Sequence, residues 1–79
     1  MSELYVRHAR LEGHSVALLR AVNEEDRVVV EAKVWPKNAA EGSVVEPGPY
    51  VFSSPVEATR FVTQAVEAFI ALGCDVRAS

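Results

Sequence analysis

The chain has 79 residues, a formal net charge of −3 and one cysteine. This length predicts a single small domain, 1–79, and the lone cysteine excludes an intramolecular disulfide framework and a multi-cysteine metal site. Nearly half of the residues are hydrophobic, which is enough for a core, and the acidic balance disfavours a general polyanion binder. Since the first residues lack an apolar leader and no apolar run reaches the ~20 residues of a membrane span, we expect a cytoplasmic protein.

Three strands are predicted in the first half of the chain, separated by short polar turns. They are expected at Leu4–Leu11, Ser15–Val22 and Arg27–Trp35. In the third segment, one set of alternate positions is wholly apolar, which is typical of a strand with one buried face. Pro36 should end this strand, because proline cannot donate a hydrogen bond to a sheet.

The connection at residues 36–48 is longer than most loops and leaves three interpretations open: a flexible lid, a binding loop or a crossover. A short fourth strand is expected at Pro49–Ser53, where apolar residues follow a Pro-Gly turn. The last residues, 75–79, form a tail that we expect to pair only briefly, if at all.

One helix is predicted from about Pro55 to Leu72. Ser54 suits its N-cap, Pro55 suits the first helical position, and Glu57 can complete a capping box with Ser54. Gly73 stands where a left-handed residue commonly ends a helix. The order β-β-β-β-α therefore predicts an α+β fold, a four-stranded antiparallel meander with a single C-terminal helix packed on one face.

The two sides of this sheet follow from where the hairpins turn. Turns centred on Glu12-Gly13 and on Glu24-Glu25 place a nearly wholly apolar set of residues on one side, which we expect to pack against the helix. This set is Leu4, Val6, His8, Ala17, Leu19, Ala21, Val28, Val30, Ala32 and Val34. His8 would then be a neutral core residue with one hydrogen bond.

The other side mixes basic, aromatic and aliphatic residues and is the candidate binding face. Its candidate residues are Tyr5, Arg7, Leu18, Arg20, Arg27, Val29, Lys33 and Trp35. The favoured interpretation is a homodimer interface in which aliphatic side chains bury against a second subunit and Arg and Lys stems cover apolar surface. A protein partner could dock on this face or on the long loop.

The alternative for the same face is single-stranded nucleic-acid binding. Aromatic rings can stack bases while Arg and Lys side chains follow the phosphates. The β-β-β-β-α order with such a face resembles that of whirly-type single-stranded DNA binders in topology, and that resemblance implies a nucleic-acid partner.

Nothing in the sequence predicts catalysis. Phosphate-binding, zinc-protease and nucleophile-elbow motifs are missing, and we expect no serine or cysteine to have a histidine placed to activate it. Cys74 follows the capping glycine and is expected to be a small buried hydrophobe. The chain is thus predicted to be a non-catalytic interaction module without a cofactor or metal.

Overall fold

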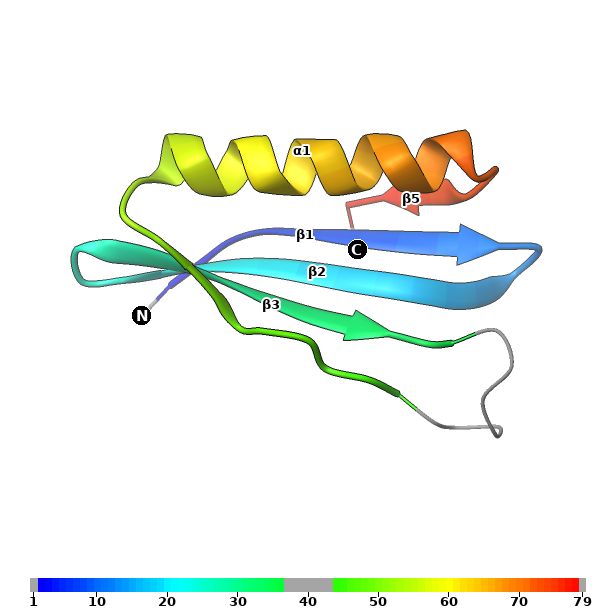
Figure 1. Ribbon diagram of the computed structural model, residues 1–79, viewed down its shortest axis with the longest axis horizontal. Coiled ribbons are helices and arrows are strands. Elements are labelled where there is room, and N and C mark those ends of the chain that lie inside the picture. Colours follow the sequence, from blue (N-terminus) through cyan, green and yellow to red (C-terminus); the bar gives the residue numbers. More distant parts are fainter. Residues whose placement is uncertain (1, 37–43, 79) are drawn as a thin grey trace.

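The computed structural model describes residues 2–36 and 44–78, which form one five-stranded antiparallel sheet and one helix (Figure 1). The strands are β1 (Ser2–Leu11), β2 (His14–Glu24), β3 (Arg27–Val34), β4 (Tyr50–Phe52) and β5 (Asp75–Arg77), and the helix is α1 (Pro55–Ala71). The sheet order is β4-β3-β2-β1-β5. The predicted α+β fold is confirmed, with a fifth strand that the four-stranded meander did not include.

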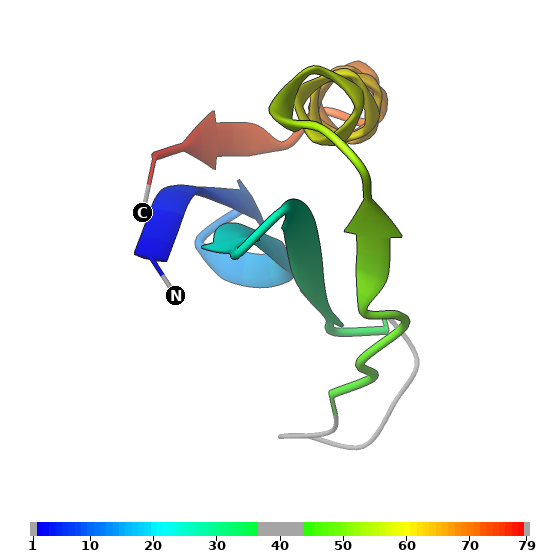
Figure 2. The same cartoon turned by 90° about the vertical axis from the view of Figure 1, so that its left-hand side faces the viewer.

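The sheet is curled, and α1 lies across its concave side (Figure 2). The helix and the sheet come close together at Ala58 of α1 and Ala21 of β2, because both side chains are small. Each is fully buried in the shared core. Around them pack partly buried aromatic rings from β1, β4 and α1. No residue larger than valine is fully buried among those described, so the core is thin.

Both ends of α1 form the predicted caps. The Ser54 hydroxyl accepts a hydrogen bond from the Glu57 amide at 3.3 Å, and Pro55 begins the helix. The Glu57 carboxylate does not return to Ser54. It instead accepts a hydrogen bond from the Ser53 hydroxyl at 2.8 Å, so the capping box is only half formed.

At its C-terminal end, α1 closes with a full Schellman motif. Gly73 has a φ of +96°, the Cys74 amide donates to the Phe69 carbonyl and the Gly73 amide donates to that of Ile70, both at 2.9 Å. This turn directs the chain into β5, which pairs with β1 across His8–Arg10. The predicted tail at residues 75–79 therefore supplies an edge strand.

The β2–β3 hairpin turns one residue later than predicted, at Glu25-Asp26. Consequently Leu19 pairs with Ala32 and Ala21 pairs with Val30, a shift of two residues along β3. Side chains alternate with a period of two, so this shift leaves every residue on its predicted side. The apolar positions of β2 and β3 do face α1.

In β1 the predicted sides are wrong over the middle of the strand. Beyond the Leu11↔His14 and Arg10↔Ser15 pairs, a bulge at Val16 shifts the β1–β2 register by one residue. Tyr5, Arg7 and Ala9 then lie opposite Ala21, Leu19 and Ala17, on the side of α1. Val6 and His8 move to the other side, because a one-residue shift exchanges the two faces.

Between β3 and β4 the chain runs back along the edge of β3. Val34 and Val45 exchange backbone hydrogen bonds of 2.8 Å, and β4 then pairs with Val28–Val30. The predicted connection at 36–48 lies partly outside the described residues, at 37–43, and so does the last residue of the predicted tail. Within the described ranges, α1 is not long and apolar enough to cross a membrane.

Candidate functional site

The outer face is the side of the sheet turned away from α1, and no described element covers it (Figure 2). Six of the eight predicted binding residues lie there by strand alternation from the core positions: Leu18, Arg20, Arg27, Val29, Lys33 and Trp35. The structure therefore brings together most of the predicted face, on the neighbouring strands β2 and β3 and the residue that follows β3.

Tyr5 and Arg7 are the two predicted residues that the structure separates from this group. The Tyr5 ring packs against the core beneath α1, and its hydroxyl lies 3.2 Å from the Thr59 hydroxyl. The Arg7 guanidinium stacks 5.1 Å from the centre of the Tyr5 ring and donates to the Val6 carbonyl at 2.8 Å. Placing them on the candidate face was wrong, and the reason is the bulge at Val16.

The charges on the outer face largely pair with one another. Arg20 bonds Glu3 at 2.7 Å and Glu31 at 2.6 Å, and these hydrogen bonds, that of Glu3 first, raise the pKa of the Arg20 guanidinium above its ordinary value. Arg27 lies 3.6 Å from Glu24. The predicted basic character of this face is therefore reduced by Glu31, which strand alternation already placed there, and by Glu3 and Glu24.

Apolar side chains occupy two zones of the outer face. Val22 and Val29 pair directly and are 2% and 8% exposed, although they point away from the helix. At the other end of the sheet, Leu18 and Trp35 are half-buried, and the Trp35 ring lies 6.3 Å from that of His8. This end offers rings and an aliphatic chain to a partner, with the exposed Lys33 directly opposite Leu18.

His8 lies beside this second zone, not in the core beneath α1 where it was predicted. Its Nε2 atom is 2.9 Å from the Ser15 hydroxyl, so the expectation that no serine would have a histidine within reach is also wrong. The pair sits on an open sheet surface and His8 is partly buried. A hydrogen bond that satisfies both polar groups explains the contact.

Cys74 behaves as expected of a small hydrophobe. It is 8% exposed and clusters with Ala9 and Ala17, with Phe69 packed against them. In the described part of the chain, no three His, Cys, Asp or Glu side chains gather where they could hold a metal ion.

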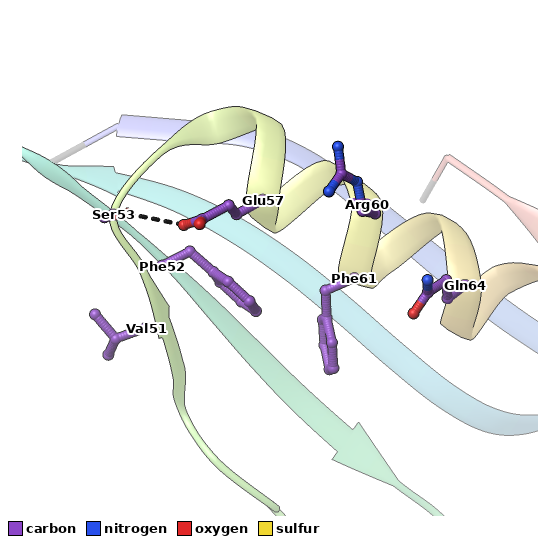
Figure 3. Close-up of a pocket in the computed structure, with 7 residues that line it drawn as sticks. All are labelled: Val51, Phe52, Ser53, Glu57, Arg60, Phe61 and Gln64. Carbon is purple, nitrogen blue, oxygen red and sulfur yellow. Dashed lines mark hydrogen bonds between the residues drawn. The ribbon is translucent and has the colours of Figure 1, made fainter.

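A second feature, the edge groove, lies between edge strand β4 and the first turns of α1 (Figure 3). It is a shallow hollow of about 570 Å³ lined by Val51, Phe52, Ser53, Glu57, Arg60, Phe61 and Gln64. Figure 3 shows the Phe52 and Phe61 rings side by side, with the Glu57 carboxylate turned toward Ser53. Sequence reasoning assigned these residues to a strand and a helix but did not join them into a site.

The signal for this groove was present in part. Tyr50 and Phe52 stand two positions apart in a short strand, and so face one side, as Phe61 does on the helix. What the sequence did not show is how the first turns of α1 pack beside this strand, which the predicted meander already places at an edge of the sheet. In comparisons with known proteins, no family model matches the chain, and neither a curated protein nor a solved structure matches it.

Proposed function

We propose that this chain is a small non-catalytic interaction module that forms a homodimer through its outer face. The observation that carries the proposal is the character of that face, where half-buried Leu18 and Trp35 adjoin a group of internally paired charges. Neutralised charges and partly exposed apolar side chains suit burial against a second protein surface.

The thin core supports the same proposal. A domain of this size buries only about 60% of the surface of its unfolded chain, and association is a common remedy. In this domain the Trp35 side chain on the outer face remains partly exposed. Two copies stacked through their outer faces would form four layers, helix-sheet-sheet-helix, with the sheets about 10 Å apart.

A second copy is the favoured occupant because the outer face is nearly self-complementary in charge. Arg20 stands between Glu3 and Glu31 near the middle of the face, so a two-fold related copy presents the same alternation of signs. Paired charges of this kind fix orientation more than they add affinity. The single cysteine suits a reducing compartment, and we place the module in the cytoplasm.

Single-stranded nucleic-acid binding remains the alternative, with less support. It relied on Tyr5 and Trp35 as stacking rings on one surface, and these two residues lie on opposite sides of the sheet. It also relied on free cations, whereas the Arg20 guanidinium is held by two carboxylates. Lys33 and Arg27 are then the exposed cations that would follow a phosphate backbone on this face.

Sedimentation equilibrium of the wild-type chain and of Leu18→Glu tests the proposal. We expect a dimer for the wild type and a monomer for Leu18→Glu, because two carboxylates would be buried in the apolar zone. Ile70→Glu, a change at a 56% exposed position on α1, is the matched control and should stay dimeric. A wild-type monomer at millimolar concentration would contradict the proposal, and circular dichroism checks that each variant folds.

A titration with a single-stranded oligonucleotide, followed by Trp35 fluorescence, examines the alternative. Quenching that saturates and is relieved by salt would favour nucleic-acid binding. Emission that ignores the oligonucleotide but changes with protein concentration would favour the homodimer.

A further inference from the structure

We propose that the edge groove binds an extended segment of a partner protein, which adds as a strand beside β4. The segment would place one apolar side chain over the rings of Phe52 and Phe61 and a carboxylate, two residues away, beside Arg60. This inference names the kind of partner for the proposed interaction module. It does not depend on the homodimer, since the groove opens between β4 and α1 and not in the middle of the outer face.

Among the described residues, the backbone of β4 is unpaired on its outer side. This strand pairs with Val28–Val30 of β3 along one side only, and it ends the described sheet. The backbone groups on its outer side are a template for a further strand. An added strand gains main-chain hydrogen bonds, while alternate side chains enter pockets next to the edge and provide specificity.

Three aromatic rings form a wall beside that edge. The Phe61 ring lies 4.8 Å from that of Tyr50 and 5.3 Å from that of Phe52, as measured between ring centres. All three rings are partly exposed rather than fully buried. The hollow over Phe52 and Phe61 is wide enough for an aliphatic side chain, and covering these rings would remove apolar surface from water (Figure 3).

The helix side of the groove carries one acidic and one basic side chain, Glu57 and Arg60. The Glu57 carboxylate on the groove wall already accepts the Ser53 hydroxyl hydrogen bond and is held at the start of α1. Arg60, one turn later, is exposed and forms no ion pair with the described residues. Its guanidinium is therefore the cation on this wall that a ligand can bind, and it selects a carboxylate, although the exposed Glu57 carboxylate beside it keeps its own charge.

The spacing of the two ligand groups follows from strand geometry. Alternate side chains of an added strand point to the same side of the sheet, so an apolar residue and an acid that both face α1 must be two positions apart. The probe is acetyl-Thr-Val-Thr-Glu-Thr-amide, tested also with Val and Glu exchanged to allow either strand direction. A second probe replaces Glu with Lys.

The experiment follows the backbone amide signals of the ¹⁵N-labelled protein by NMR during titration with each peptide. With the Glu peptide we expect saturable shifts confined to β4 and the first turns of α1. The Lys peptide should bind about fivefold more weakly, as expected of a partly exposed ion pair. Arg60→Glu should remove the preference for Glu, while Arg10→Glu, the same charge change on exposed Arg10 of β1, should keep it.

Three outcomes would overturn the inference. The first is a set of amide shifts that do not saturate or that map outside β4 and the first turns of α1. The second is equal affinity of the protein for the Glu and Lys peptides. The third is occupation of the groove by a second copy of the chain. Occupation by a second copy would appear as a dimer that persists in the Leu18→Glu variant and dissociates in the Arg60→Glu variant. Carrying out the titration on wild type and on Leu18→Glu separates failure of the groove proposal from failure of the homodimer proposal.

Discussion

Replacing Gly73 by alanine tests how the helix end holds the last strand in place. Gly73 has a φ of +96°, in the left-handed region that residues with a Cβ atom rarely adopt. A Cβ atom added there would meet only the Leu11 Cδ1 atom, at 3.8 Å, which is an ordinary contact. The cost of Gly73→Ala is therefore conformational and not steric.

The expected magnitude is a difference of two opposing effects. Left-handed backbone costs an alanine roughly 1–2 kcal/mol relative to glycine. The reduced freedom of the unfolded chain returns about 0.4–1 kcal/mol. The net loss of about 1 kcal/mol in the free energy of unfolding corresponds to a fall of about 4–8 °C in Tm for a domain of this length.

Thermal unfolding followed by circular dichroism measures this loss, and the reaction of the Cys74 thiol with a disulfide reagent reports its location. Cys74 is 8% exposed and its amide donates to the Phe69 carbonyl within the same turn. We expect faster thiol labelling in Gly73→Ala, with Gly73→Asn intermediate because asparagine tolerates left-handed backbone. A Gly73→Ala chain as stable as the wild type would refute a left-handed residue at this position.

Two further stability changes follow from the structure. Ser54→Ala removes the side-chain acceptor of the Glu57 amide and should lower the free energy of unfolding, measured by denaturant titration, by about 1 kcal/mol. The control is Thr63→Ala, on the exposed side of α1, and an equal loss in the two variants would argue against the N-cap. Ala58→Leu inserts bulk where the helix meets the sheet and should cost roughly 1–3 kcal/mol, while Ala71→Leu, at an exposed position of the same helix, should cost almost nothing. Equal midpoints for the two leucine variants would show that Ala58 is not a close contact.

The sequence was sufficient wherever the deciding interactions are local. The caps at Ser54 and Gly73 depend on a few neighbouring residues, and both formed, although the Glu57 carboxylate bonds Ser53 and leaves the capping box half complete. The sides of β2 and β3 were also correct, even though their hairpin turns one residue later than predicted. A period-two pattern is unaffected by a shift of two residues, so the fold class did not depend on the exact turn.

Only the tertiary structure decided the composition of the two candidate sites. A bulge at Val16 exchanges the sides of β1, and nothing in the local sequence distinguishes that residue from its apolar neighbours. The ion pairs of Arg20 with Glu3 and Glu31 depend on how side chains of three neighbouring strands come together, and the edge groove depends on how Phe61 of α1 packs against Phe52 of β4. Local propensities set where helix and strands form, whereas the partners of each strand depend on contacts between residues far apart in the chain.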